Sequence, residues 1–492
     1  MTAPASPIEL TGSGTRLGTQ PAPLPPGFTD RLAAITDVVT DPETVHDASR
    51  DWWPLALHWA LAGQVPQRAA LMVRPADTGE VAAVLSLCDA ARVPVTPAGG
   101  RSGVCGASVP VFGGVLLDTT RLDRLCAVDE FAGIVEVEAG MFGPDLESAL
   151  HGQHGLTVGH FPQSFDISTV GGWVACRGAG QYSTRYGKIE HMLVGLEIVL
   201  ADGRVIRTGG APAAAAGPDL TQLFAGSEGT LGVITRAWLR AHPVASHTAM
   251  RAYRFRNVHD GFEACRRIVR AGATPAVLRL YDAFESARGR GGDGATCTLL
   301  VLDEGDPAIV AATIEIVERV AAELGEPAQP QLVEEWLEHR NDTSALQALT
   351  RKGYVVDTME IAAPWSRLSE IYAATITALT AVPHAIVASC HLSHSYLDGA
   401  CLYFTFAATP PAAEIEATYV ALWDAGQRAV LTSGGNLSHH HGVGLNRARF
   451  AREALGLAFD VLRDVKRALD PNGVLNPGKL GLPSPFGDPA WP

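Results

Sequence analysis

Apolar and polar residues alternate in short units near the start of the chain. Residues 71–73 are apolar and predict a strand. Asp77 and Glu80 then stand three positions apart just before an amphipathic stretch, which is the pattern of a capped helix start, so we expect a helix over residues 81–91.

The same alternation continues through the first half of the chain. Residues 134–138 alternate like a half-buried strand, and residues 144–151 have helical spacing. Residues 195–207 predict a hairpin that turns at Asp202-Gly203. Strands and helices in such short units favour an α+β fold over a single doubly wound sheet.

Helical spacing marks residues 28–63, where Pro54 suits the first turn of a helix. After residue 244, strands and helices repeat up to about residue 430. We expect strands at 251–255, 277–280 and 298–302, and helices at 262–271 and 310–324. A last helix is expected over residues 450–469, ended by Asp470-Pro471-Asn472-Gly473.

Three segments rich in glycine and small polar residues interrupt this pattern, at residues 97–103, 162–187 and 225–234. Small residues leave backbone amides uncovered, and glycine adopts positive φ at low cost, so such loops can surround a pyrophosphate. The first segment, PAGGRSG, matches neither the dinucleotide fingerprint nor a Walker loop. One such loop alone is also typical of a plain turn, whereas the three together predict a large extended ligand.

Composition narrows the class of protein. The 492 residues suggest two or three domains, and the 47% hydrophobic content is that of a well-buried enzyme. The net charge of −14 disfavours nucleic acid as a partner. The eight cysteines are scattered without C-x-x-C spacing, which indicates reduced thiols in a cytoplasmic protein. No secretion signal or spanning segment is evident, and residues 1–27 are expected to be a disordered tail.

The ordered set PAGGRSG, ISTVGG and GSEGTLGVIT resembles the FAD-binding lobe of the vanillyl-alcohol oxidase (PCMH-type) flavoprotein superfamily. The resemblance implies a two-lobe α+β fold, in which a PCMH-type FAD-binding domain is followed by a substrate domain with an antiparallel sheet flanked by helices. It also implies FAD contacts at three sets of residues: Pro97, Ala98, Gly99, Gly100, Arg101, Ser102 and Gly103; Gln163, Ser164, Asp166, Ser168, Thr169, Cys176, Arg177, Gly178 and Ala179; and Glu228, Gly229, Thr230, Leu231, Gly232, Val233 and Ile234.

Members of this superfamily that attach FAD covalently often carry a histidine in or beside the first loop. Here Val104 and Cys105 follow that loop. We therefore expect non-covalent FAD, with Cys105 as the alternative attachment point.

Two motifs near the C-terminus help to distinguish the reactions that members of the superfamily catalyse. The D-lactate and D-2-hydroxyglutarate dehydrogenases of the superfamily carry a metal motif of histidines and a glutamate. At the corresponding positions this chain has Tyr403 and His440, and the asparagine of the motif is missing. We therefore expect no metal site, despite His391 and His394.

The same replacements resemble the alkyldihydroxyacetonephosphate synthase family, whose patterns GAC-x-YF and SHHHGVG occur here at residues 399–404 and 438–444. The resemblance implies that Tyr403 is the acid/base residue and that His439, His440 and His441 form an active-site cluster. It also implies that Arg279 binds substrate. Such an enzyme exchanges an acyl for an alkyl group on dihydroxyacetone phosphate and uses flavin without net redox change. A phenol suits acid/base work if nearby cations lower its pKa.

A second interpretation stays open. The segment from Trp336 to Arg340 looks more like the hydroxy-acid dehydrogenases, in which Arg340 would hold a carboxylate while hydride passes to flavin. In either interpretation Arg340 is a substrate-binding candidate. Oxidation of another alcohol, and a flavin-binding module without catalysis, are further alternatives.

These motifs define the expected organisation. We expect a tail at residues 1–27, the FAD-binding domain at 28–243, the substrate domain at 244–446, and a C-terminal helix and tail at 447–492 that return to the FAD lobe. The expected partners are a small-molecule or lipid substrate and a second copy of the chain in a homodimer, with peripheral membrane contact left open.

Overall fold

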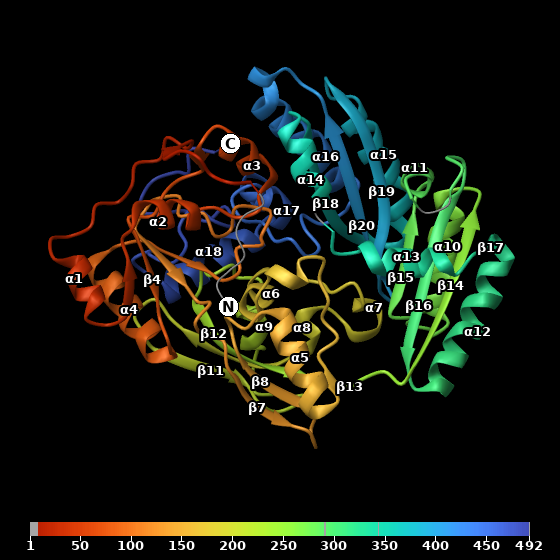
Figure 1. Ribbon diagram of the computed structural model, residues 1–492, viewed down its shortest axis with the longest axis horizontal. Coiled ribbons are helices and arrows are strands. Elements are labelled where there is room, and N and C mark those ends of the chain that lie inside the picture. Colours follow the sequence, from red (N-terminus) through yellow and green to blue (C-terminus); the bar gives the residue numbers. More distant parts are fainter. Residues whose placement is uncertain (1–7, 290–291, 343, 492) are drawn as a thin grey trace.

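The computed structural model describes residues 8–289, 292–342 and 344–491 (Figure 1). Two lobes lie side by side, one formed by the first half of the chain and the other by a large sheet from the second half. The predicted two-lobe α+β organisation, with an antiparallel sheet flanked by helices in the second lobe, is confirmed by this arrangement.

The first lobe contains a small sheet built around the first glycine-rich loop. Its strand order is β2 (Asp37–Val39), β4 (Leu71–Arg74), β6 (Val115–Asp118) and β5 (Val95–Ala98), and only β2 runs antiparallel to its neighbour. The loop at 97–103 therefore starts at the end of β5. The predicted helix is α4 (Thr78–Ala91), where Asp77 accepts from the Glu80 amide and Glu80 reaches back to the Ala76 amide.

A five-stranded antiparallel sheet completes the first lobe. Its strand order is β11 (Val205–Gly209), β10 (Leu193–Val199), β12 (Val233–Arg240), β8 (Ile134–Glu138) and β7 (Leu125–Asp129). The predicted hairpin is β10–β11, and Gly203 has the positive φ of 86° that its turn requires. Beside this sheet lie helices α5 (Gly143–His154), α6 (Val170–Cys176), α8 (Ile189–Met192) and α9 (Leu220–Phe224), whereas α7 (Ser183–Tyr186) contacts β15 (Val277–Tyr281) and β19 (Ala385–Ser395) of the second lobe.

The second lobe is a seven-stranded antiparallel sheet. Its strand order is β17 (Glu326–Ala328), β14 (His247–Phe255), β16 (Cys297–Gly305), β15 (Val277–Tyr281), β19 (Ala385–Ser395), β20 (Gly399–Ala408) and β18 (Val355–Pro364). Four helices pack against its strands: α10 (Val258–Arg270), α12 (Pro307–Leu324), α15 (Leu368–Thr380) and α16 (Ile415–Thr432). Three shorter helices follow its loops: α11 (Ala283–Ala287), α13 (Gln331–His339) and α14 (Ser344–Arg351).

Period-two alternation separates the two faces of this sheet. Leu278, Leu280 and Phe404 belong to the apolar core under the helices. Arg279 and Tyr403 fall between such residues and point to the opposite face, toward the first lobe. The alternation thus places these polar side chains on the face of the sheet that is turned toward the first lobe.

Three sequence predictions need correction. Residues 28–63 form not one helical region but α1 (Phe28–Ala33), β2, α2 (Pro42–Ala48) and α3 (Pro54–Leu61), although α3 does begin at Pro54 as expected. The expected helix 450–469 is interrupted at Gly456, whose φ is 55°, and gives α17 (Ala451–Leu455) and α18 (Ala458–Leu469). A residue with positive φ cannot continue a right-handed α-helix, which explains the break.

The expected disordered tail is wrong for its described part. Ile8 is fully buried beside α3, and β1 (Gly14–Thr15) pairs in parallel with β3 (Gln64–Val65). Apolar burial and strand pairing offset the entropy of ordering this segment. Residues 1–7 of the predicted tail lie outside the described residues.

The C-terminal segment returns to the first lobe, where α18 lies beside the N-terminal elements in Figure 1. Leu475 forms a bridge with Val95 of β5, and the Val95 carbonyl accepts from the Asn476 amide at 2.7 Å. Lys466 of α18 donates to the carbonyl of Thr230 at 2.8 Å. The C-terminal segment therefore packs against the first and third glycine-rich segments.

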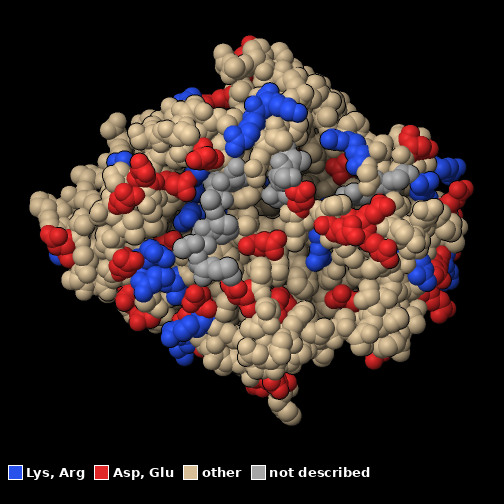
Figure 2. Space-filling view, viewed as in Figure 1, with Lys and Arg blue, Asp and Glu red and all other residues tan. Residues whose placement is uncertain are grey.

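Among the described residues, the helices are too short or too polar to cross a bilayer. On the face drawn in Figure 2, acidic and basic side chains are interspersed over both lobes.

Candidate active site between the lobes

The three glycine-rich segments meet at one place. A Cβ atom on Gly99 would lie 2.4 Å from Thr169 Oγ1, and one on Gly100 would lie 2.2 Å from the Ile167 carbonyl oxygen. A Cβ atom on Gly229 would lie 2.8 Å from Cγ of Pro97. Because contacts below 3.0 Å exclude any side chain, the glycines are required for this close approach.

Local strain marks all three segments. Arg101, Arg177 and Glu228 each have φ near 50°, which residues other than glycine rarely adopt. The amides of residues 100–103 donate no hydrogen bond to any described part of the protein. The Thr169 hydroxyl and the Ser227 hydroxyl are buried and also lack partners among the described residues. We call the three glycine-rich segments, residues 97–103, 162–187 and 225–234, the cradle. Its free donors fit a pyrophosphate, so the residues present fit FAD.

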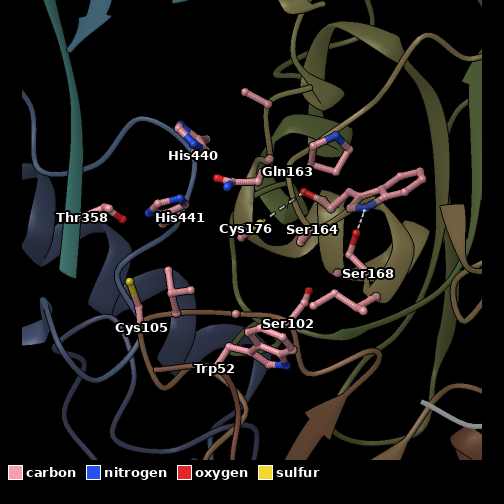
Figure 3. Close-up of a pocket in the computed structure, with 18 of the residues that line it drawn as sticks. Trp52, Ser102, Cys105, Gln163, Ser164, Ser168, Cys176, Thr358, His440 and His441 are labelled. Carbon is pink, nitrogen blue, oxygen red and sulfur yellow. Dashed lines mark hydrogen bonds between the residues drawn. The ribbon is translucent and has the colours of Figure 1, made fainter. Parts of the chain in front are cut away.

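A cavity of about 700 Å³ connects this cradle with the sheet of the second lobe. Figure 3 shows Trp52, Ser102, Gln163 and Cys176 on the cradle side, facing His440 and His441. The predicted cofactor residues that line the cavity are Pro97, Ala98, Gly99, Gly100, Arg101, Ser102, Gly103, Gln163, Ser164, Ser168, Thr169, Cys176, Gly178, Ala179, Glu228, Gly229, Gly232, Val233 and Ile234.

Four predicted cofactor residues do not line it. Asp166 is exposed to solvent, and Leu231 lies in the apolar core of the first lobe. The Arg177 guanidinium donates to Gln222 at 3.1 Å, and the Thr230 hydroxyl donates to the Ser227 carbonyl at 2.7 Å. The side chains of Arg177, Thr230 and Leu231 therefore contact the protein and not the cavity, and that of Asp166 faces solvent.

Glu228 also has a structural contact that its motif does not reveal. Its carboxylate accepts from the amides of Val443 and Gly444 at 2.6 and 2.7 Å. Burial raises the pKa of Glu228 to about 7, although these amides oppose the shift. The side chain therefore fastens the C-terminal loop to the third glycine-rich segment.

On the substrate side, Tyr403 of β20 is directly paired with His391 of β19, and their rings stack at 4.7 Å. The Tyr403 hydroxyl donates to Thr358 Oγ1 on β18 at 3.0 Å. Both Tyr403 and Thr358 line the cavity. The structure thus brings the predicted acid/base residue to the cavity wall.

The electrostatics of Tyr403 differ from the sequence-based expectation. Burial raises the pKa of the Tyr403 hydroxyl well above its usual range, and the hydrogen bond to Thr358 only partly opposes this. The charge of Arg279 also opposes the rise but does not reverse it, so the condition set for acid/base work, a pKa lowered by nearby cations, is not met. The phenol is therefore a proton donor at neutral pH, and a base must be sought among its neighbours.

The loop at residues 438–441, called the histidine loop below, is held by one carboxylate. Glu360 Oε1 accepts from Ser438 Oγ at 2.6 Å and from the amides of His440 and His441 at 3.1 and 2.8 Å. Its other oxygen, Oε2, lies 2.9 Å from His441 Nδ1. Glu360 of β18 is paired with Tyr403 of β20, so the residue that anchors the histidine loop also lies directly beside the phenol.

Arg447 keeps that carboxylate ionised. Both side chains are fully buried and form an ion pair. Burial alone would raise the pKa of Glu360, but the charge of Arg447, helped by His441, holds it well below its usual range. An ionised Glu360 can therefore hold the histidine loop through charge-assisted hydrogen bonds.

This pair predicts a large effect on stability. Replacing Arg447 by methionine leaves a buried, unpaired carboxylate, so we expect the free energy of unfolding to fall by about 3–5 kcal/mol. The matched control is Arg428→Met, because Arg428 pairs with Glu453 at 2.8 Å but on the surface, where about 0–1 kcal/mol is expected. Urea unfolding of both variants measures the difference. Equal losses would contradict the assignment of Glu360 as a charged anchor.

Three imidazoles gather beside the histidine loop. The ligand nitrogens of His394, His439 and His440 lie within 4.8 Å of one another, a spacing at which they could hold a metal ion. In the structure they make hydrogen bonds instead: His439 Nδ1 with His440 Nδ1 at 2.8 Å, and His394 Nδ1 with Ser183 Oγ at 2.6 Å. The expected absence of a metal remains a prediction.

The surroundings of all three imidazoles favour the neutral form. Burial is the main cause that lowers the pKa of each well below the usual histidine range. Lys188 adds to the shift of His439, and it donates to the His439 carbonyl at 2.6 Å. His440 and His441 line the cavity, whereas His439 lies behind them.

The two predicted arginines flank Trp336. Arg279 lies 5.8 Å from the Trp336 ring and donates to His391 and, at 2.8 Å, to the Tyr281 hydroxyl. Arg340 also lies 5.8 Å from Trp336, and it lies 5.0 Å from the Tyr182 ring. Its Nη1 is buried without a hydrogen-bond partner among the described residues, which suits an anionic ligand. Both arginines line the cavity.

Sequence reasoning missed several residues of this site. Glu285 contacts His391 Nδ1 at 2.8 Å, but it lies on the short helix α11, where no motif singles it out. Lys188 and Glu360 were also missed, because each acts from a distant segment. The sequence did single out His391 and His394, but it assigned them no role; both lie on β19, where a bulge follows Leu392.

The two thiols near the cradle bear on how FAD is held. Cys105 and Cys176 both line the cavity, and burial is the main cause that raises the pKa of each thiol above its usual value. A thiol held in its neutral form is a poor nucleophile. Non-covalent binding of FAD stays our expectation.

With this geometry established, comparison with known proteins gives the family. Residues 69–209 match the family described as FAD binding domain, and residues 244–480 match FAD linked oxidases, C-terminal domain. The FAD-linked oxidoreductase YgcU of Escherichia coli K12 is 32% identical over 430 residues, covering 84% of this chain and 88% of that protein. The chain belongs to the FAD-linked oxidase family. FAD is therefore the cofactor of this protein.

Two other relatives of this FAD-linked oxidase represent different chemistries. Alkyldihydroxyacetonephosphate synthase of Dictyostelium discoideum is 29% identical over 459 residues, covering 85% of this chain and 74% of that protein. Glycolate oxidase subunit GlcD of Bacillus subtilis is 28% identical over 421 residues, covering 83% and 88%. A solved alkyldihydroxyacetonephosphate synthase is 25% identical with a TM-score of 0.77, covering 96% of this chain and 90% of that one. The predicted superfamily and synthase resemblance are thus confirmed.

Proposed function

We propose that this FAD-linked oxidase family member is a transferase that exchanges an acyl for an alkyl group on dihydroxyacetone phosphate. The observation that carries the proposal is the arrangement around Tyr403: a protonated phenol stands beside neutral imidazoles, at the position where the hydroxy-acid dehydrogenase motif has a histidine. The similarity to alkyldihydroxyacetonephosphate synthases supports the same choice.

The side chains of the cavity fit the requirements of that exchange. The reaction removes a proton beside the ketone, expels a carboxylate and returns a proton when the alcohol has added. A neutral imidazole can take a proton and the Tyr403 phenol can give one, so opposite roles fall to different groups. Arg340 and Arg279 are placed to neutralise the substrate phosphate and the leaving carboxylate. When bound, FAD supplies an electron-accepting ring, used here without net redox change.

An assay of product formation tests the proposal. The FAD-loaded protein is incubated with acyl-dihydroxyacetone phosphate and a radiolabelled fatty alcohol, and label is measured in lipid that survives alkaline hydrolysis. Alkali-stable labelled ether is the expected product. Label recovered only in the free alcohol, with a correctly folded, FAD-loaded protein, would reject the transferase proposal.

Arg340 supports a second candidate, a flavin-dependent dehydrogenase of D-2-hydroxy acids such as D-lactate or glycolate. Its unpartnered Nη1 could hold a substrate carboxylate, and the neutral imidazoles could accept the hydroxyl proton. The similarity to glycolate oxidase subunit GlcD supports this candidate.

Arg340→Met distinguishes an anion-binding role from a structural one. We expect the KM for the anionic substrate to rise by about 10- to 100-fold, because a charged hydrogen bond contributes about 1.5–3 kcal/mol. The control is Arg288→Met, which changes another arginine of the cavity wall that lies over Phe284. An unchanged KM for Arg340→Met in steady-state kinetics would show that Arg340 does not hold substrate.

A further inference from the structure

Two arginines of the cavity wall share one aromatic neighbour. Trp336 of α13 is buried, with 3% of its surface exposed, and it lines the cavity. The guanidinium carbon Cζ of Arg279 lies over the Trp336 ring at 5.8 Å from its centroid, and Cζ of Arg340 lies over the same ring at the same distance. Arg279 belongs to β15 and Arg340 follows α13, so one indole connects two separate segments of the second lobe.

Neither arginine has a counter-ion in the part of the chain that the structure describes. The guanidiniums of Arg279 and Arg340 form no ion pair with a carboxylate of the described residues, and Glu285, which also lines the cavity, contacts His391 instead. Arg279 donates to Tyr281 and His391, which leaves three of the five N–H groups of its guanidinium for a ligand. Nη1 of Arg340 is buried without a hydrogen-bond partner among the described residues. A cation removed from water needs an opposite charge nearby, so each arginine suits an anionic group of the substrate.

Further rings fix each guanidinium separately. Cζ of Arg279 lies over Tyr281 at 5.5 Å, and Cζ of Arg340 lies over Tyr182 at 5.0 Å. Tyr281 belongs to the same strand as Arg279, whereas Tyr182 comes from the first half of the chain. The negatively polarised face of an aromatic ring attracts a guanidinium. Because the Trp336 ring attracts both, it sets the position of one arginine relative to the other.

We propose that Trp336 is a positioning residue that joins Arg279 and Arg340 into one two-point anion site, and that the substrate carries two anionic groups at the matching distance. The inference rests on the proposed function only in placing an anionic substrate in this cavity. In the transferase reaction the two groups are the phosphate and the carboxylate that leaves. In the dehydrogenase reaction a hydroxy acid with two carboxylates occupies both points, whereas D-lactate and glycolate occupy one.

The shared ring favours a ligand with two charges over a ligand with one. Because both Cζ atoms lie 5.8 Å from one centroid, they are at most twice that distance apart. Once one anionic group is bound, a second group of the same molecule reaches the other arginine without a new loss of translational freedom. Loss of the Trp336 ring would leave both charges in place but remove their fixed spacing, so it would weaken mainly the binding of dianions.

Binding of simple carboxylates to the FAD-loaded protein tests the site without turnover. Isothermal titration calorimetry compares malonate, succinate, glutarate and adipate, each with the monocarboxylate of the same carbon number. We expect at least one dicarboxylate to bind about tenfold or more tightly than its matched monocarboxylate, because a charged hydrogen bond contributes an effect of that size. Arg279→Met and Arg340→Met should each abolish this advantage. A series without any preference for a dicarboxylate would overturn the two-point site.

Variants of Trp336 test its part in the site. Trp336→Leu should weaken binding of the preferred dicarboxylate by about 5- to 30-fold and that of the monocarboxylate by less, whereas Trp336→Phe keeps a ring face and should retain most of the affinity. Trp336→Met, which keeps more of the volume, replaces Trp336→Leu if that variant does not fold. The matched control is Trp238→Leu, because Arg207 lies over Trp238 at 5.6 Å outside the cavity wall. This control should bind like the wild type.

A double variant separates positioning from packing. If Trp336 acts through the arginines, Trp336→Leu should weaken dicarboxylate binding little further in a protein that already carries Arg279→Met. Fully additive losses, or a folded, FAD-loaded Trp336→Phe protein that binds as weakly as Trp336→Leu, would overturn the role of Trp336. These titrations need no reaction, so a preference for dicarboxylates stands even if no ether product forms and the proposed function fails.

Discussion

Replacing Gly100 by tryptophan is expected to yield a protein without FAD. A Cβ atom at this position would lie 2.2 Å from the Ile167 carbonyl oxygen and 3.2 Å from the Phe142 ring. The nearest atom belongs to the backbone of the opposing loop, so it cannot move aside cheaply. The indole would fill the space between the two loops that offers free amides to the pyrophosphate. The measurement is the ratio of visible flavin absorbance to protein absorbance after purification.

The matched control is Gly152→Trp, because Gly152 is exposed on α5 and a Cβ atom there would meet no atom of the described residues within 4 Å. That variant should purify with the same flavin content as the wild type. Circular dichroism of both variants separates loss of FAD from loss of fold. A folded Gly100→Trp protein that retains FAD would contradict the position of the cradle.

Replacing Tyr403 by phenylalanine is expected to lower turnover by about 10²–10⁴-fold while FAD remains bound, because general acid catalysis contributes an effect of that size. The stacked contact with His391 needs only the ring and survives the change. The fall in turnover therefore measures what the hydroxyl proton of Tyr403 contributes to catalysis. The measurement is kcat in the ether-forming assay, with flavin content recorded for each sample.

Thr358→Val is the companion variant, since it removes the acceptor of the Tyr403 hydroxyl at 3.0 Å but leaves the phenol. We expect a smaller loss, because the hydrogen bond orients the proton and does not supply it. If Tyr403→Phe were no slower than Thr358→Val, the phenol would not be the acid, and the histidine loop would have to supply both proton steps.

Local signals in the sequence were sufficient for much of the fold. Asp77 and Glu80 mark the start of α4, and Asp202-Gly203 marks the β10–β11 turn, because capping and turn chemistry depend on neighbouring residues. The glycine-rich segments were identified for a similar reason. Glycine is required there for close approach, as between Gly100 and Ile167, or for positive φ, as at Gly229.

Features that depend on distant contacts could not be predicted this way. The segment from Ile8 to Gly27 resembles a free tail in composition, yet Ile8 is ordered by α3, which the sequence does not connect to it. The direction of the Tyr403 pKa shift depends on its burial between two lobes. The role of Glu360 depends on Arg447, 87 residues away. Such partners become visible only after the chain has folded.

The central claim is that this cavity uses its flavin for proton-coupled exchange and not for oxidation of hydroxy acids. The most direct test is the visible spectrum of the FAD-loaded protein under anaerobic conditions, before and after addition of D-lactate, D-2-hydroxyglutarate and glycolate. We predict that the yellow colour persists with all three, while acyl-dihydroxyacetone phosphate and a fatty alcohol give ether product. Bleaching by a hydroxy acid would show hydride transfer to the flavin and would replace the transferase proposal with the dehydrogenase.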